Sequence, residues 1–327
     1  MHVGIIGPPG TDLFQDNIND TLRRMGHRVS HLGSARIGRG GRLGNRVGSL
    51  VLHAFPATED GFHRRLVRNA WTSECDAVIS TDGNLSPAAV AVLRRQRIPV
   101  ALWFPDAVAG MGRQRMLAAP YTALFFKDPL LVKRLRDTLG LPVSYLPEAC
   151  NPRWHRPLGE AGSVRKIAVV GNTYLSRLLL IRRLHEAGIP MVIYGAPTPR
   201  WARDLLPADL HVGRSVFADD KSRVFRTAAG VLNNLHPAEM HGVNCRLFEA
   251  TAAGAAVLCE QRPVLAELFD TEREVVPFRD FAELTDRARA LLDDAALTRT
   301  IGDAANKRAH SEHTYESRLT TILEKLA

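Results

Sequence analysis

The sequence has few of the residues that mark secreted, zinc-binding or membrane-spanning proteins. Only four of its 327 residues are cysteines, and none of them has Cys-x-x-Cys spacing, which argues against a zinc site and a disulfide framework. No apolar run approaches the roughly 20 residues that span a bilayer. The start of the chain also lacks the basic segment and long apolar stretch of a signal peptide. We therefore expect a cytoplasmic protein without a membrane partner.

Lysine is scarce, so the net charge of +9 is carried mostly by arginine. The arginines occur along the whole chain, with one local concentration from Arg36 to Arg46, whose glycines predict a flexible, solvated loop. We interpret the charge as a solvated surface, with attraction of an anionic small ligand as the second interpretation. No basic stripe interleaved with aromatic residues is present, so nucleic acid is not an expected partner.

What the sequence does have is core material for two domains of ordinary size. Hydrophobic residues make up 45% of the chain. In the first half, short apolar runs alternate with amphipathic stretches, which predicts parallel strands joined by helices. The predicted strands are Val3–Ile6, His27–Leu32, Ala77–Ser80, Val100–Phe104, Thr122–Phe126 and Val143–Leu146. The predicted helices are Leu13–Met25, Phe62–Trp71, Pro87–Gln96 and Pro129–Leu139.

A proline-rich segment, Leu146–Pro157, ends this series and is interpreted as a linker. A second alternating series follows it, and the tail from Phe281 onward is largely helical. Its predicted strands are Lys166–Val170, Met191–Tyr194, Gly230–Asn233 and Ala255–Cys259, with helices at Leu175–Ala187, at Ala218–Ala228 and from Asn244. The fold class is therefore α/β, with two Rossmann-like doubly wound domains, the first over residues 1–150 and the second beginning at residue 151.

Ligands of such sheets bind beyond the carboxyl ends of the strands, so the residues that follow each strand are the candidates. In the first half, Asp12 follows the glycine-containing turn after the first strand, and Asp106 follows Phe104. Either carboxylate could act as a general base on an acceptor hydroxyl. Asp12 as a helix cap and Asp106 as a turn residue are the structural alternatives.

In the second half, Gly171 and Asn172 follow a strand and precede a helix that carries Arg177, a side chain suited to a pyrophosphate. Tyr194 and Gly195 end the next strand, where the glycine leaves room for a base ring. Further along, polar side chains gather after the strand that ends at Asn233, namely Asn234 and His236.

The most informative stretch runs from Asn233 to Leu258, and within it Asn244 to Glu249 is predicted to be the start of a helix. Free amides at a helix N-terminus attract phosphate. Asn244, Cys245 and Arg246 stand at this start, and Glu249 follows three residues after Arg246, on the same side. The functional interpretation places Arg246 on phosphates and Glu249 on a ribose. An ordinary intrahelical ion pair is the alternative.

These residues resemble the GT-B glycosyltransferases, most closely the CgeB-like group. The resemblance rests on Gly171–Tyr174 with Arg177, on Leu232–Pro237, and most of all on Gly242–Glu249 with Ala253-Gly254. The final segment, with Glu312–Tyr315 and a last amphipathic helix, also fits. It implies two Rossmann-like domains facing a cleft, with an N-terminal acceptor-binding domain over 1–150, a nucleotide-sugar domain over 151–311, and a C-terminal helix, 312–327, that packs back on the first domain.

The resemblance also implies residue roles. Arg246, Asn244, His236 and Arg177 would hold the donor diphosphate, Glu249 the ribose, and Asp106 or Asp12 would be the base. His241 stands where retaining relatives have the first glutamate of an E-x-x-x-x-x-x-x-E pattern, which favours inversion. No metal or cofactor is expected, because helix N-termini and basic side chains stabilise the leaving group. The acidic pairs Asp219-Asp220 and Asp293-Asp294 fall in or beside predicted helices.

The expected function is thus transfer of a sugar, by default from a UDP-sugar, to a hydroxyl of a small-molecule acceptor, by a monomer or homodimer. Two alternatives stay open. One is an NAD-dependent oxidoreductase, disfavoured because no Gly-x-Gly-x-x-Gly followed by an acidic strand end is present. The other is a non-catalytic nucleotide-sugar-binding or coat-associated protein that keeps the fold.

Overall fold

The computed structural model describes residues 1–35, 56–108, 114–172, 174–198 and 200–327. Within them the chain divides into two compact units. Unit 1 comprises Met1–Pro147 and Tyr315–Ala327, and unit 2 comprises Glu148–Thr314. The arginine-rich segment Arg36–Arg46, expected to be a flexible loop, lies outside the described residues. None of the helices in the described part is long and apolar enough to cross a membrane.

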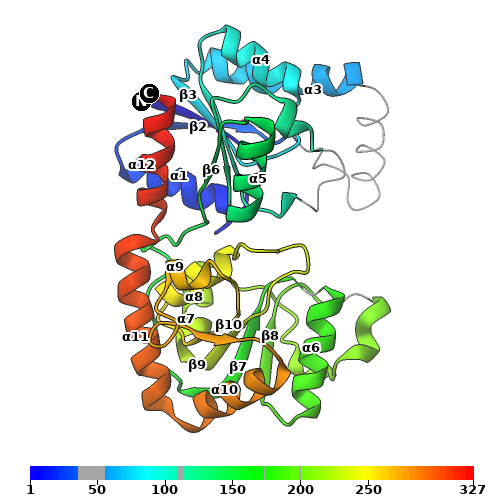
Figure 1. Ribbon diagram of the computed structural model, residues 1–327, viewed down its shortest axis with the longest axis vertical. Coiled ribbons are helices and arrows are strands. Elements are labelled where there is room, and N and C mark those ends of the chain that lie inside the picture. Colours follow the sequence, from blue (N-terminus) through cyan, green and yellow to red (C-terminus); the bar gives the residue numbers. More distant parts are fainter. Residues whose placement is uncertain (36–55, 109–113, 173, 199) are drawn as a thin grey trace. The chain divides into compact units, whose positions relative to one another are not determined.

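Unit 1 contains a parallel sheet of six strands in the order β2-β1-β3-β4-β5-β6 (Figure 1). The three strands after β2 are wholly buried, as expected for a parallel sheet covered on both faces. The strand order reverses between β1 and β3, which makes the ends of these two strands a switch point. The strands are β1 (His2–Ile6), β2 (Arg28–Gly33), β3 (Ala77–Ser80), β4 (Val100–Phe104), β5 (Ala123–Phe126) and β6 (Val143–Tyr145).

Among the described residues, four helices connect these strands, and a fifth comes from the end of the chain. Their starts and stops follow local chemistry: the Asp128 side chain caps α5 and accepts from the Leu131 amide, and Gly140 ends it in the left-handed conformation (φ +62°). The helices are α1 (Phe14–Arg24), α3 (Pro56–Thr72), α4 (Pro87–Arg95), α5 (Pro129–Leu139) and α12 (Tyr315–Leu326). A short 3-10 turn, η2 (Arg115–Ala118), precedes β5.

Helix α12 belongs to unit 1, although 167 residues of unit 2 separate it from the rest of that unit. It packs beside α1 and against β4 and β5 (Figure 1). Its first residue, Tyr315, joins an aromatic cluster with Trp103, at 5.7 Å between ring centroids, and Phe14, at 5.8 Å. The C-terminal helix therefore crosses back to the N-terminal domain, which confirms that part of the predicted fold.

Unit 2 contains a parallel sheet of five strands in the order β11-β10-β9-β7-β8. With the first sheet, it confirms the predicted α/β class with two doubly wound domains. The strands are β7 (Val164–Val170), β8 (Met191–Tyr194), β9 (Ala228–Asn233), β10 (Val257–Glu260) and β11 (Val276–Phe278). Sequence analysis missed β11 because it has three residues and a central proline, which a sheet tolerates only at its edge.

The helices of unit 2 are α6 (Leu175–Glu186), α7 (Ala218–Thr227), α8 (Cys245–Ala252), α9 (Leu265–Leu268), α10 (Phe281–Asp293) and α11 (Ala295–Glu312). Two 3-10 turns, η3 (Arg200–Leu205) and η4 (Ala208–Leu210), lie between β8 and α7. Helices α8 and α11 pack closely. Glycine at position 302 permits this approach, because a Cβ there would lie only 2.1 Å from the Gly254 carbonyl oxygen. Gly254, at φ +78°, also ends α8.

Candidate functional site

The turn after β7 is shaped by a glycine that faces an arginine of α8. Gly171 has φ +120°, and a Cβ there would lie 2.8 Å from Nη2 of Arg246. The Arg246 guanidinium donates from Nη1 to the Val170 carbonyl at 2.6 Å. Arg246 thus ties the start of α8 to the end of β7. The predicted neighbours Gly171 and Arg246 are brought together, while Thr173 of the same motif lies outside the described residues.

The glycine after β8 has a packing role. A Cβ at Gly195 would lie 2.3 Å from the carbonyl oxygen of Gly171, so only glycine lets the ends of β7 and β8 approach this closely. Tyr194 is half-buried, and its carbonyl accepts from the Gly171 amide at 2.8 Å. Tyr194 and Gly195 therefore border the Gly171 turn. The structure explains the glycine without a nucleobase.

Arg177 does not project into solvent as an exposed helix arginine would. It is 7% exposed, and its Nε donates to Oδ1 of Asn234 at 2.9 Å. Its Nη1 donates to the Asn172 carbonyl at 2.9 Å and its Nη2 to the Asn234 carbonyl at 3.0 Å. Burial lowers the pKa of Arg177 from its ordinary value. Each guanidinium nitrogen is thus engaged by protein, and the side chain joins the β7 turn to the residue after β9.

The Tyr174 ring and His236 complete this side of the site. The Arg177 guanidinium lies 4.7 Å from the Tyr174 ring centroid, and the His236 ring lies 4.8 Å from it. Asn234 donates from Nδ2 to the Tyr174 hydroxyl at 3.0 Å, and burial raises the pKa of that hydroxyl. His236 is exposed, and its Nδ1 accepts from the Ala238 amide at 3.1 Å. This bond assigns the ring proton to Nε2, which makes His236 a donor.

The N-terminus of α8 has no side-chain cap. Asn244 occupies the N-cap position with extended backbone (φ −107°, ψ 168°), yet its side chain accepts from no helix amide. Its buried Oδ1 has no hydrogen-bond partner among the residues that the structure describes. Since an N-cap side chain normally satisfies one of the first amides, this helix start keeps the polarity that attracts an anion.

Cys245, the first residue of α8, is held as a neutral thiol. Burial raises its pKa well above the ordinary value, and the nearby carboxylates of Glu249 and Glu148 raise it further. A thiol must ionise to be a nucleophile. Cys245 therefore contributes its backbone amide and packing to the helix start, and its sulfur is not suited to covalent catalysis.

Glu249 is buried within an ion pair that sequence analysis did not predict. Its Oε1 lies 3.0 Å from Nζ of Lys221 on α7, and both side chains are almost fully buried. Its Oε2 lies 3.8 Å from Nε of Arg246, which is the expected pair three residues apart on α8. Lysine is rarely this buried unless it is paired. A sequence signal existed: Lys221 lies four residues before the buried Phe225, on the apolar face of its helix.

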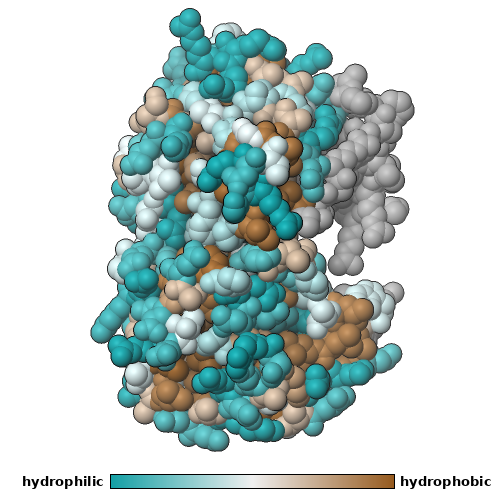
Figure 2. Space-filling model, in the orientation of Figure 1, coloured by the Kyte–Doolittle hydropathy of each residue, from teal (hydrophilic) through white to brown (hydrophobic). Residues whose placement is uncertain are grey.

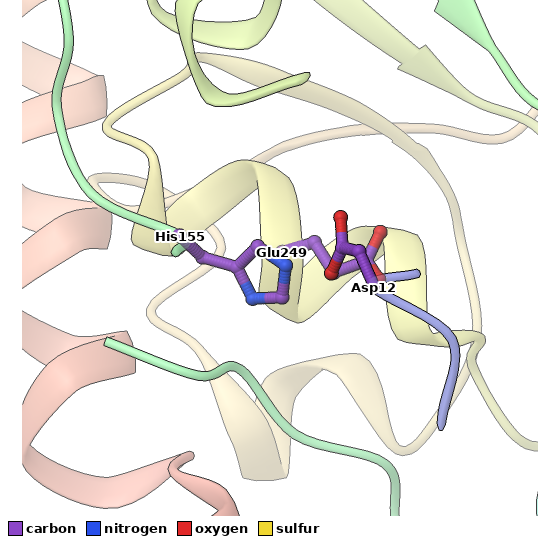
Figure 3. Close-up of side chains that lie close together, drawn as sticks. All are labelled: Asp12, His155 and Glu249. Atoms are coloured by element: carbon purple, nitrogen blue, oxygen red, sulfur yellow. The ribbon is translucent and has the colours of Figure 1, made fainter. Parts of the chain in front are cut away.

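His155 is the second group that sequence analysis missed. Figure 3 shows its ring beside the Glu249 side chain of α8, and a ring nitrogen lies within 4.8 Å of a Glu249 oxygen. The ring is buried, and Nδ1 accepts from the Asn151 amide at 2.9 Å. His155 lies in the proline-rich segment interpreted as a linker, where nothing in the local pattern distinguished it. Only the fold places it against α8.

The acidic pair at the start of α7 is engaged in surface ion pairs. Asp219 lies 3.0 Å from Arg156, and Asp220 lies 3.6 Å from Arg214. The pair lies within a helix, as predicted, and occupies its first turn, where carboxylates interact favourably with the helix dipole.

The two base candidates lie in unit 1 and differ in their surroundings. Asp12 has left-handed backbone (φ 55°), and its Oδ1 accepts from Nδ2 of Asn17 at 3.3 Å. It is not the helix cap, because Leu13 holds the N-cap position of α1. Asp106 is exposed just after β4. Both follow strand ends of the unit 1 sheet, as predicted.

Both the sequence and the fold of this chain resemble those of known proteins. Residues 177–324 match the family model described as glycosyl transferase-like. No curated protein matches the sequence. The fold is nevertheless shared over whole chains with solved glycosyltransferases. The chain has the GT-B fold.

Three solved structures illustrate this shared fold. Sucrose-phosphate synthase from Thermosynechococcus elongatus is 13% identical, with a TM-score of 0.70 over 99% of this chain and 97% of that one. HepE from Anabaena, in complex with UDP-glucose, is 13% identical, with a TM-score of 0.67 over 100% and 99%. AviGT4, a glycosyltransferase involved in avilamycin A biosynthesis, is 16% identical, with a TM-score of 0.62 over 99% and 96%.

Proposed function

We propose that this protein transfers a sugar from a nucleoside-diphosphate sugar, most simply a UDP-sugar, to a hydroxyl of a small-molecule acceptor such as a specialised metabolite. The observation that carries the proposal is the uncapped N-terminus of α8, with Arg246 at its first turn and Glu249 three residues on. Support comes from the structures of HepE, which contain UDP and UDP-glucose, and from the role of AviGT4 in avilamycin A biosynthesis.

On the donor side, the α8 amides, Arg246, Asn244 and His236 bind the diphosphate. Charge builds on these oxygens as the glycosidic bond breaks, so preorganised donors lower the barrier. Arg177 has a positioning role here, because its donors are engaged by Asn172 and Asn234. It holds the Gly171 turn against the end of β9.

Glu249 accepts from the ribose hydroxyls in this proposal, and Lys221 orients it. Nζ of Lys221 lies 3.0 Å from one carboxylate oxygen of Glu249. This ion pair fixes the Glu249 side chain in one rotamer, where it would otherwise adopt several. A buried carboxylate without such a partner would protonate or move. Lys221 is therefore a positioning residue for nucleotide binding, and Tyr194 and Gly195 border the place of the base.

The acceptor hydroxyl is deprotonated by a carboxylate of unit 1, Asp106 or Asp12. We propose inversion at the anomeric carbon, because His241 occupies the position of the first glutamate of retaining relatives. We also propose that no metal takes part, since helix amides and Arg246 supply the positive charge that a metal would otherwise provide.

Titration calorimetry with UDP tests the donor site. Glu249→Gln should weaken UDP binding at least tenfold, while Glu267→Gln, at an exposed carboxylate of α9, should not. Arg246→Lys keeps the charge but cannot contact both the Val170 carbonyl and the Glu249 carboxylate as the guanidinium does. It should therefore also weaken UDP binding. Thermal unfolding establishes that each variant folds. UDP affinity equal to wild type in the folded Glu249 variant would remove the ribose assignment.

Assays with UDP-sugars and a panel of hydroxylated acceptors test the reaction. Release of UDP that depends on acceptor excludes a merely binding protein, and binding of NAD in preference to UDP would favour the oxidoreductase alternative. Activity that survives EDTA supports the metal-free proposal, and the anomeric configuration of the product decides inversion. Asp106→Asn and Asp12→Asn, compared at equal UDP affinity, identify the base, which should lose turnover by orders of magnitude.

A further inference from the structure

The positive charge of this chain is concentrated in one unit. Unit 1 contains 21 lysines and arginines against 13 carboxylates, a net charge of +8. Unit 2 contains 22 against 21, a net charge of +1. Basic residues are spread along the whole sequence, as expected, but the carboxylates that balance them are not. The excess therefore belongs to unit 1, whereas the proposed donor site is formed by residues of unit 2.

Surface ion pairs occur in both units, for example Arg24 with Asp20 in unit 1 and Arg156 with Asp219 and Arg182 with Glu186 in unit 2. In unit 1 a group of exposed arginines has no carboxylate within 4.0 Å in the described part of the chain. These residues stand at the C-terminal ends of two helices and form, with one tryptophan, what we call the α3–α4 surface: Arg68, Trp71, Arg94, Arg95 and Arg97.

The topology brings these five residues to one edge of the sheet. Helix α3 leads into β3, and α4 leads into the neighbouring β4, so both helices end at the amino-terminal edge of parallel strands. The helices contact each other, and packed helices lie about 8–10 Å apart. That spacing is close to the Debye length, so the arginines act together on an anion. Ligands of the sheet bind at the opposite edge.

Helix α4 and the two residues after it contribute three arginines, one more than the two basic residues in the last turn of α1 or α6. The position after the α4 C-cap has left-handed backbone (φ 61°) and is occupied by Arg97, where glycine is usual. Figure 2 shows the α4 end of unit 1 covered mainly by hydrophilic residues.

Trp71 adds an exposed aromatic ring to this basic surface. Its side chain is 64% exposed at the end of α3. Tryptophan has an apolar body and one polar N–H, and it is enriched where protein meets the headgroup region of a bilayer. A cluster of arginines gains affinity for anionic lipid, roughly fivefold per residue near the surface. Arginines with an interfacial tryptophan fit a lipid surface better than a nucleic-acid groove.

In contrast to the expectation from the sequence that there is no membrane partner, we propose that the α3–α4 surface binds anionic lipid headgroups and attaches the enzyme reversibly to a membrane. Its arginines pair with lipid phosphates, and the Trp71 ring enters the headgroup region. The carboxyl edge of the unit 1 sheet stays away from the lipid. The proposal does not depend on the sugar, the nucleotide or the acceptor.

Vesicle co-sedimentation of the full chain tests it, with phosphatidylcholine alone or with one third phosphatidylglycerol. Wild type should sediment only with the anionic vesicles, and 0.5 M salt should release it. Arg94→Glu with Arg95→Glu should weaken binding at least tenfold. The matched control, Arg165→Glu with Lys166→Glu, makes the same charge change at an exposed strand end of unit 2 and should stay within twofold of wild type.

Two further variants separate binding from folding. Arg97→Gly removes a charge and relieves the left-handed backbone, so it should weaken vesicle binding several-fold without loss of stability. Trp71→Ala keeps all charges and should also weaken vesicle binding. Equal sedimentation of the Arg94/Arg95 variant and its control would overturn the proposal. So would no wild-type binding to anionic vesicles at low salt, or tighter binding to single-stranded RNA than to vesicles.

Discussion

At the scale of single residues, the structure separates two arginines that sequence analysis treated alike. Both Arg177 and Arg246 were expected to bind phosphate. Arg177 is buried, and it donates to Asn172 and Asn234 from every guanidinium nitrogen. Arg246 lies in the first turn of α8 and packs against Gly171, whose missing Cβ leaves room for the guanidinium. The first organises the site, and we propose that the second binds the ligand.

The buried pair of Lys221 and Glu249 yields the first prediction. Lys221→Met leaves the Glu249 carboxylate buried without its closest cation and should lower the free energy of unfolding by about 3–5 kcal/mol. Arg182→Met breaks the exposed pair with Glu186 and should cost less than about 1 kcal/mol. Urea unfolding measures both. Equal losses would mean that the Lys221 pair contributes no more than a surface pair.

At the scale of elements, α8 connects the proposed donor site to the core of unit 2. Its first residues border the Gly171 turn, and its body is buried against α11. Arg226 donates to the Gly254 carbonyl at 2.9 Å, and Asn306 donates to the Ala252 carbonyl at 2.6 Å, so the last turn of α8 is bound by α7 and α11. The position of the helix start therefore depends on packing at the helix end.

Substitution by alanine should have opposite effects on stability at two glycines, one in α11 and one in α3. Gly302→Ala places a Cβ against the Gly254 carbonyl, and overpacking should cost about 1–3 kcal/mol. Gly61→Ala, in the exposed face of α3 with nothing within 4 Å, should instead add about 0.5–1 kcal/mol of stability. Thermal unfolding with UDP titration checks both. A Gly302 variant as stable as wild type would show that α11 can shift freely.

At the scale of the whole molecule, the chain leaves unit 1 once and returns to it with α12. The helix covers β4 and β5 with a wholly buried tyrosine at its start. Unit 1 is thus incomplete until the last residues of the chain are added. Its fold requires contacts between residues separated by more than 200 positions.

Tyr315→Ala tests this dependence. Loss of a buried aromatic ring should cost about 3–5 kcal/mol, and it should act on unit 1 first. Amide hydrogen exchange resolves the units: protection should fall in β4 and β5 while β7 and β9 keep theirs. Thr320→Ala, on the exposed face of α12, should leave exchange unchanged. Equal loss of protection in both sheets would contradict a unit-specific role.

By itself the sequence determined the class of the fold, because buried parallel strands and their helices leave regular local patterns. It also identified the α8 segment, where a polar turn, a helix start and a glycine stop lie within a few residues. Only the tertiary structure decided that Lys221 and His155 lie against Glu249, that Arg177 is buried, and that β11 pairs with β10. These facts depend on contacts between distant segments, and local periodicity carries no information about them.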